Sequence, residues 1–407
     1  MKWSPLGGIM LVGMLAWAQG GSNYSVFGVG DLHPSVGALY DGAASIGVAL
    51  VSESGISTVN PALWTFVRST RLQGGYRFRQ QAISSPTETR AQNNGKVEGL
   101  LAIFAIDTAQ GWSASIGFYP LSSVNAAVAV PIEARLPQDS LDGSYRMLAT
   151  GGITVAHLGA ATQLSSNFGL GVTFRYHFGL FRTERVTELH DPWSAPDTLT
   201  ITDWLSGAGL AVGSWYRPLP EWLLTIALTT PVQMSTQQLW RYSFSHTYSD
   251  TTLKWSELRW QLPALVAAGV AYQRERTTAT IELGYSNFRS LAYRQARSVS
   301  LQPLYRISLS IHRAPRIGGR RSYWQQIGVS AGASWQQLYY RVHGHLISEY
   351  AFASGLGLPL GTAALLEIAC QTGVRGKRAP QLLREWFGRF TFTLSISEQW
   401  FLPSHRR

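Results

Sequence analysis

The chain of 407 residues has little charge and a single cysteine. Asp, Glu, Lys and Arg together make up 14% of it, roughly half of the ~25% that is usual in globular proteins. One cysteine, Cys370, cannot form a disulfide within the chain, and a disulfide scaffold is therefore excluded. A disordered chain is excluded too, because such chains are poor in aromatic residues, whereas this one has 15 Trp, 17 Tyr and 16 Phe.

Long hydrophobic runs are also missing. No stretch beyond the N-terminus offers the ~18 consecutive apolar residues of a membrane-spanning helix. The first residues combine Lys2, a short apolar stretch at 6–15 and the small-residue pattern Ala16-Trp17-Ala18. This is the arrangement of a secretory signal peptide, and we expect cleavage after Ala18. An exported chain without spanning helices can still cross a membrane as a closed β-barrel.

Apolar and polar residues alternate with a period of two from about residue 70 onward, which indicates strands. In residues 168–180 every even position is large and apolar, and every odd position is glycine or polar. Residues 277–285, 305–312 and 390–397 repeat the pattern. Soluble strands usually have about five or six residues, and these stretches are often longer, with aromatic residues near their ends as in membrane barrels. We therefore predict an all-β transmembrane antiparallel barrel.

The connections between these stretches are short and long in alternation, as in outer-membrane barrels. Counting through them predicts about 14 strands, an even number, as is usual for such barrels. Residues 19–68 lack the strand pattern and are predicted to form an N-terminal hatch, or plug, inside a barrel of residues 69–407. Short turns are expected near residues 109–110, 165–166, 217–220, 274–276, 315–320 and 355–358, and longer connections at 86–95, 189–198, 244–251, 289–300 and 374–385.

Polar residues on the inward face are the candidate ligand or gating residues. A charged side chain can be hydrated or paired in the lumen, whereas an arginine facing lipid near the midplane costs about 2–4 kcal/mol. Such residues either contact a ligand or hold the hatch in place. The candidates are Arg175, His177, Glu282, Arg306 and His312 in the barrel and Asn60, Pro61 and Ala62 in the hatch.

The sequence offers no convincing catalytic or metal-binding motif. Ser330 stands in a G-x-S-x-G stretch, but a nucleophile elbow needs a strand–turn–helix context, and these residues alternate like a strand. His343 and His345 share one strand face without an identifiable third metal ligand. We therefore expect no enzyme, no metal site and no cofactor.

The formal net charge of +11 is dispersed along the chain. Basic residues gather at 313–321, assigned to a turn, and at 375–384, assigned to an outer loop. We expect them to contact outer-membrane lipids and lipopolysaccharide, because basic residues beside a membrane bind anionic head groups. Nucleic acid is not an expected partner, since it requires a compact basic patch or a recognition element.

Several short motifs resemble a known family. Residues 24–31 (YSVFGVGD), 56–62 (ISTVNPA) and 392–401 (FTLSISEQWF) resemble segments of FadL-like long-chain fatty-acid transporters from Bacteroidetes/Chlorobi-type bacteria. The resemblance implies a fourteen-stranded outer-membrane barrel with a luminal N-terminal hatch. It also implies passive uptake of hydrophobic compounds. A terminal strand ending in Trp400 and Phe401 is expected to contact the barrel-assembly machinery.

Three functions remain open at this point. The leading hypothesis is a hatch-gated channel in the outer membrane of a Gram-negative-type bacterium for fatty-acid-like or hydrocarbon molecules. The second is a protein-interaction barrel, such as a type IX secretion shuttle, without a transport role. The third, a barrel enzyme, would need a Ser–His pair within hydrogen-bond reach at the outer rim.

Overall fold

The computed structural model describes residues 22–86, 88–135, 140–190, 196–244, 250–296, 299–316, 322–380, 382–398 and 400. The predicted signal peptide and Phe401 lie outside the described residues. The wall strands are β2 (Thr70–Ser84), β3 (Thr89–Asp107), β4 (Trp112–Pro120), β5 (Ser122–Arg135), β6 (Ser140–Ser165), β7 (Phe168–Leu189), β8 (Asp197–Leu219), β9 (Trp222–Thr229), β10 (Val232–Phe244), β11 (Asp250–Leu262), β12 (Leu265–Arg274), β13 (Thr277–Asn287), β14 (Val299–Leu301), β15 (Pro303–Arg313), β16 (Gly328–Val342), β17 (His345–Leu360), β18 (Ala364–Ala379) and β19 (Leu382–Glu398).

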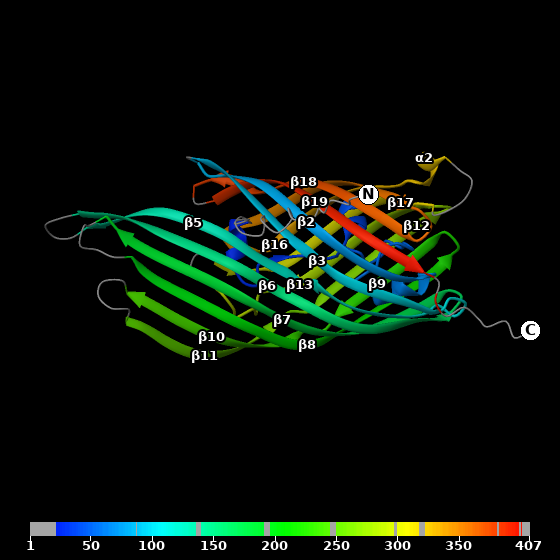
Figure 1. Ribbon diagram of the computed structural model, residues 1–407, viewed down its shortest axis with the longest axis horizontal. Coiled ribbons are helices and arrows are strands. Elements are labelled where there is room, and N and C mark those ends of the chain that lie inside the picture. The colour runs from blue at the N-terminus through cyan, green and yellow to red at the C-terminus, as the bar shows by residue number, and fades with distance from the viewer. Residues whose placement is uncertain are drawn as a thin grey trace, which may run out of the picture.

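These strands form one closed antiparallel barrel (Figure 1), in which β19 pairs with β2. At four positions in the wall, one barrel strand is interrupted and forms two shorter strands: β4/β5, β9/β10, β11/β12 and β14/β15. A proline lies at every division, namely Pro120, Pro231, Pro263 and Pro303, because proline cannot donate a ladder hydrogen bond. When each interrupted pair is counted as one strand, the wall has 14 strands, and the predicted number is confirmed.

The two faces of the wall differ as the alternation indicates. On β7, Phe174, Tyr176 and Phe178 are 40–50% exposed on the outside, whereas Arg175 and His177 point inward and are buried. Cys370 is exposed on β18. Among the described residues, no helix is long and apolar enough to span a membrane.

Three of the predicted connections are wrong. Residues 355–358 lie inside β17, residues 86–95 belong mostly to β3, and residues 374–385 belong mostly to β18 and β19. Residues 355–358 were assigned to a turn because of their glycines. Gly355 instead allows α1 (Ala38–Gly42) to pack closely against β17, since a Cβ there would lie 3.1 Å from the Cα of Gly42. Arg375, assigned to an outer loop, is 3% exposed on the inward face of β18.

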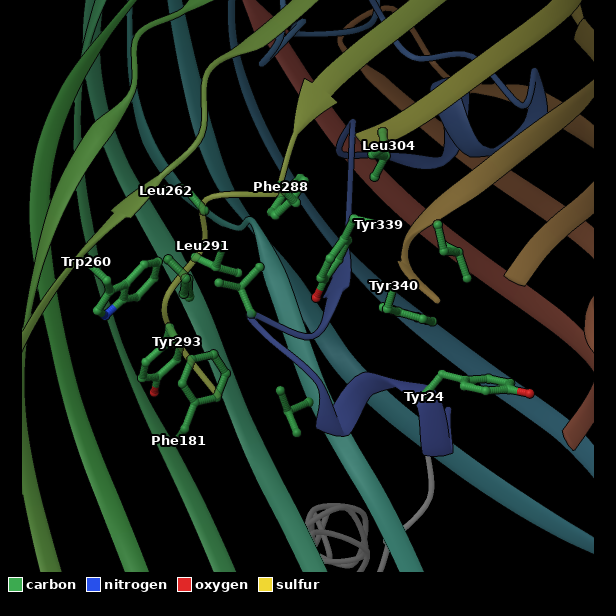
Figure 2. Packing of buried hydrophobic residues seen from close by; sticks show 14 of the residues in the cluster. Tyr24, Phe181, Trp260, Leu262, Phe288, Leu291, Tyr293, Leu304, Tyr339 and Tyr340 are labelled. Atoms are coloured by element: carbon green, nitrogen blue, oxygen red, sulfur yellow. The ribbon is translucent and has the colours of Figure 1, made fainter. Parts of the chain in front are cut away.

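Residues 22–67, here called the N-terminal segment, lie against the inward face of the wall (blue in Figure 1). Their regular structure is short: η1 (Asn23–Val26), β1 (Asp31–Leu32), α1 (Ala38–Gly42) and η2 (Pro61–Phe66). Tyr24 packs near Tyr340, and residues of the β13–β14 connection pack in the same cluster (Figure 2). A fourth helix-type element, α2 (Tyr323–Gln326), lies between β15 and β16.

Part of the wall extends beyond the rest. At the end where β5 joins β6, β7 joins β8 and β10 joins β11, these six strands form a sheet in the order β5-β6-β7-β8-β10-β11. We call it the six-strand extension. In Figure 1 it reaches farther left than β2, β18 and β19.

Candidate functional site

An internal cavity lies between the N-terminal segment and the wall. Its volume is about 90 Å³, and the empty space grows to about 900 Å³ when the part open to the exterior is included. Two of the wall's divisions border it through Leu121 and Pro263, and Thr230 borders it at a third. The lining is mostly apolar and comprises Leu32, His33, Pro34, Ile46, Thr58 and Val59 of the N-terminal segment with Tyr119, Leu121, Arg175, His177, Thr229, Thr230, Leu262, Pro263, Leu265, Gly284, Ser286, Phe288, Leu304, Arg306 and Gln336 of the wall.

The ionisable groups of the lining are basic or neutral. Arg175 donates from Nη1 to Thr229 Oγ1 at 3.0 Å and from Nη2 to the carbonyl oxygen of Thr58. Arg306 makes no ion pair or hydrogen bond with a described residue, and its Nε is buried without a partner. No aspartate or glutamate lines the cavity. Such a site combines an apolar body with cationic hydrogen-bond donors, which suits a ligand with an apolar tail and an acceptor or anionic head.

Three predicted residues therefore meet in one place: Arg175, His177 and Arg306 line the cavity. Glu282 has a different position, because its buried carboxylate accepts hydrogen bonds from the N-terminal segment. The donors include Ile46 N at 2.6 Å, Ala49 N at 2.7 Å and Ser45 Oγ at 2.7 Å. Successive backbone N–H groups that face one anion form a nest, and Glu282 therefore anchors this part of the segment.

The predicted hatch residues Asn60, Pro61 and Ala62 contact the wall and one another. Asn60 caps η2 by accepting a hydrogen bond from Ala62 N at 3.0 Å, and its Nδ2 donates to Ser214 O at 3.3 Å. Pro61 lies against β7, since a Cβ on Gly171 would come within 2.5 Å of its carbonyl carbon. His312 is buried on the inward face of β15 but does not line the cavity.

An ionic cluster that was not predicted from the sequence lies beside the cavity, and its central residue His33 also lines the cavity. Asp41 of α1 accepts from Arg77 of β2 at 2.7 Å, and Asp31 of β1 accepts from Arg375 at 2.7 Å. Glu349 accepts from Arg375 at 2.6 Å and from Arg389 at 2.8 Å. The ionic cluster consists of five cations and five anions around His33: Arg77, Arg79, Lys96, Arg375 and Arg389 with Asp31, Asp41, Glu98, Glu349 and Glu385.

His33 sits at the centre of this cluster with a cation beside each ring nitrogen. Its Nδ1 lies 2.7 Å from Arg77 Nη1, and its Nε2 lies 2.8 Å from Lys96 Nζ. Burial, together with the charges of Lys96 and Arg77, lowers the pKa of His33 well below its ordinary value. The imidazole is therefore neutral, and one of its nitrogens accepts a hydrogen bond.

A signal for the ionic cluster was present in the sequence. Residues 71–79 alternate like the other strands, which places Arg77 and Arg79 on the inward face by the argument applied to Arg175. Their partners could not be found in this way. Asp31 and Asp41 belong to a segment without periodicity, and its position in the lumen depends on tertiary contacts.

Solved structures with the same fold support the architecture. A Pseudomonas aeruginosa FadL homologue is 10% identical, with a TM-score of 0.62 over 91% of this chain and 100% of the other. The Ralstonia pickettii toluene transporter TbuX is 10% identical, with a TM-score of 0.62 over 89% and 98%. The CymD monoaromatic hydrocarbon channel is 12% identical, with a TM-score of 0.61 over 90% and 99%. The chain thus has the fold of FadL-type channels.

Comparison by sequence leads to one family. No curated protein matches the chain at a significant level. A family model described as BamG matches residues 5–405, nearly the whole chain. The chain therefore belongs to the BamG family.

Proposed function

We propose that this protein is an outer-membrane channel of a Gram-negative-type bacterium that takes up small hydrophobic molecules passively. The observation that carries the proposal is the mostly apolar cavity inside a closed barrel, bordered by interruptions of the wall. The cavity volume of about 90 Å³ is below the range of small-molecule sites, about 300–1,000 Å³, so a ligand enters only when the N-terminal segment shifts. The fold shared with hydrocarbon channels supports the same reading.

The chemistry of the lining favours an amphipathic ligand over a neutral hydrocarbon. Arg306 forms no hydrogen bond with a described residue, and Arg175 has an unpaired Nε. No acid lines the cavity, and the acids nearest to Arg306, such as Glu349, interact with it without a direct ion pair. A carboxylate or similar head would supply the missing acceptors through charge-assisted hydrogen bonds. The apolar remainder, which includes Ile46, Val59 and Leu304, would hold the tail.

In this proposal the N-terminal segment is the gate. Residues 46–59 contribute Ile46, Thr58 and Val59 to the cavity lining, and they are fixed to the wall mainly by hydrogen bonds and apolar contacts. A shift of this part would connect the cavity with the end of the barrel where β6 joins β7. At that end the β6–β7, β8–β9 and β12–β13 connections are short turns, which face the periplasm in outer-membrane barrels, and the β15–β16 connection with α2 is longer.

Uptake into liposomes tests the proposal. Full-length protein in liposomes is expected to admit a labelled long-chain fatty acid, and Arg306→Met is expected to weaken its binding about tenfold, as loss of a charged hydrogen-bond donor implies. His312→Ala is the matched control, because His312 lies on the same strand and face without lining the cavity. Uptake no faster than in empty liposomes would contradict the channel. Equal effects of both variants would contradict the assigned head-group site.

A second candidate function follows from the family. Its name points to the barrel-assembly machinery, and an assembly role requires contacts with other proteins and no open path. The ionic cluster is compatible with a plugged barrel, since it fixes Asp31 and Asp41 to the wall strands β2 and β18. Co-purification of the tagged full-length protein with the assembly machinery, combined with an absence of uptake, would favour this candidate. Uptake without co-purification would favour the channel.

A further inference from the structure

The six-strand extension has two edge strands, β5 and β11. The N-terminal segment covers the edge of β5. At the first edge, β5 pairs with β1 at Ser122 and Ser123. Beyond this point, side chains of the N-terminal segment cover the backbone: Ser25 Oγ accepts from Asn125 N at 3.1 Å, and Asn23 Oδ1 accepts from Ala127 N at 3.3 Å. Farther along, Pro131 has no N–H to offer. The edge of β5 is therefore protected.

The second edge, β11, has no such protection among the described residues. Its 13 residues pair with β10 on one side only. The following strands do not cover it, because β13 ends at Asn287, and β14 starts at Val299 and pairs with β16. An edge strand with a row of unpaired N–H and C=O groups is a template for another strand.

The connection that leaves this edge open is folded into the lumen. Tyr293 stacks on Trp260 with ring centroids 4.5 Å apart, and its hydroxyl donates to Asp203 at 2.5 Å. Phe288 stacks on Tyr339 at 4.2 Å. Figure 2 shows Tyr293 beside Trp260 and Phe288 beside Tyr339. These buried contacts fix the connection inside, so the opening beside β11 belongs to the folded state.

The side chains along β11 add to the backbone template. Trp255 is 62% exposed and Leu253 is 54% exposed on the outer face, although the polar residues Glu257 and Arg259 separate them from the lipid-facing band. Trp204 of β8 stacks on Trp255 at 5.8 Å. Exposed aromatic residues are enriched where proteins bind other proteins. The outward-facing side chains of β11, in order toward the membrane, are therefore two apolar residues, Leu253 and Trp255, then Glu257 and Arg259.

We propose that the edge of β11 binds an extended segment of another polypeptide by strand addition, with the segment antiparallel to β11. The segment is complementary in charge: an acidic residue opposite Arg259, then a basic residue opposite Glu257, then apolar residues opposite Trp255 and Leu253. In strand addition, main-chain hydrogen bonds supply affinity and the alternate side chains supply specificity.

A second copy of this chain does not fit the same edge. An antiparallel pair of identical edge strands has its two-fold axis perpendicular to the sheet. The axis would then lie near the membrane plane, and the second barrel would be upside down in the membrane. A flexible segment of a different protein has no such restriction.

Peptide binding tests the proposal with the full-length protein in detergent or nanodiscs. A fluorescent peptide with the complementary outer row is expected to bind. The same peptide with its acidic and basic residues exchanged is expected to bind about tenfold more weakly, since two attractive cross-strand pairs become repulsive. A version with N-methyl groups on alternate amides is expected not to bind, because it cannot form the ladder.

Variants of the protein complete the test. E257R/R259E is expected to reverse the preference, so that the exchanged peptide binds more tightly than the original. The matched control is R182E/E184R, which exchanges an exposed Arg–Glu pair on β7, a strand paired on both sides. No binding of the complementary peptide, equal binding of the N-methyl peptide, or no preference between the two charge patterns would each overturn the proposal. The three peptides decide this with the wild-type protein alone.

Discussion

The N-terminal segment is held to the wall by different chemistry on its two sides. Toward β2 and β18, its acids Asp31 and Asp41 form buried ion pairs with three arginines, and Thr391 of β19 donates a hydrogen bond to Asp41. Toward β7, β8 and β13, it relies on the Glu282 nest, on neutral hydrogen bonds of Asn60 and on apolar contacts such as Val59 with Trp215. The cavity is lined mostly from this second side and reaches His33 of the ionic cluster.

This difference indicates which side can move. Separation of a buried ion pair leaves an uncompensated charge, which costs about 3–5 kcal/mol. Apart from the Glu282 nest and the contact of Arg175 with Thr58, the second side is held by neutral hydrogen bonds, which contribute about 0.5–1.5 kcal/mol each, and by apolar contacts, which can shift without isolating a charge. We therefore expect the ionic side to stay fixed while the apolar side rearranges around a ligand. The following variants test this expectation.

Arg375→Ala should have the largest effect. It removes the partner of Asp31 and Glu349 at a position that is 3% exposed. We expect a loss of about 3–5 kcal/mol in unfolding free energy, because two carboxylates remain buried with fewer cations. Urea unfolding of the purified barrel measures the change. Arg182→Ala, at a 56% exposed side chain, is the control and should change little. Equal stability of Arg375→Ala and wild type would contradict the anchoring role of the ionic cluster.

Glu282→Gln should have a smaller effect, confined to the apolar side. The amide keeps the shape of the carboxylate and loses the charge that faces the N–H groups of Ile46 and Ala49. Hydrogen bonds to charged groups contribute about 1.5–3 kcal/mol, and we expect a loss in this range. Hydrogen exchange should accelerate at the amides of residues 46–50. It should stay unchanged at Ala38, whose N–H donates a hydrogen bond to Thr393 Oγ1 near the ionic cluster. Acceleration at both places would show that the two sides are coupled.

The barrel itself was predictable from the sequence, and the packing of its contents was not. Alternation determines which residues face inward, and it places Arg175, His177 and Arg306 on the inward face, where the cavity lies. The same alternation cannot say what an inward residue meets. Glu282 and His312 satisfy the rule equally, yet one anchors the N-terminal segment and the other does not contact the cavity.

Gly213→Ala sharpens the comparison through a steric change. A Cβ at this position would come within 2.0 Å of Asn60 Oδ1 and 2.9 Å of Pro61 Cδ. Overpacking of this kind costs about 1–3 kcal/mol, and we expect η2 to shift from β8 while the ionic pairs persist. Limited proteolysis within residues 57–66 should therefore become faster. Gly388→Ala is the matched control, since its new methyl group would meet no atom closer than 3.7 Å. Unchanged proteolysis would contradict the close contact of Asn60 with the wall.

Acid should weaken the ionic side gradually and by the smallest amount. His33 is neutral in the cluster because burial and the charges of Lys96 and Arg77 hold its pKa well below the ordinary value. When the N-terminal segment is released, the imidazole titrates near its usual pKa of about 6.5. The released state therefore binds more protons, and the docked state loses up to ~1.4 kcal/mol for each pH unit below that value. Protease protection of residues 22–67 should fall between about pH 6.5 and 5. In His33→Gln this slope should flatten, whereas His190→Gln, at an exposed histidine, should keep it. If the slope persists in His33→Gln, the acids of the cluster, and not the histidine, govern its response to pH.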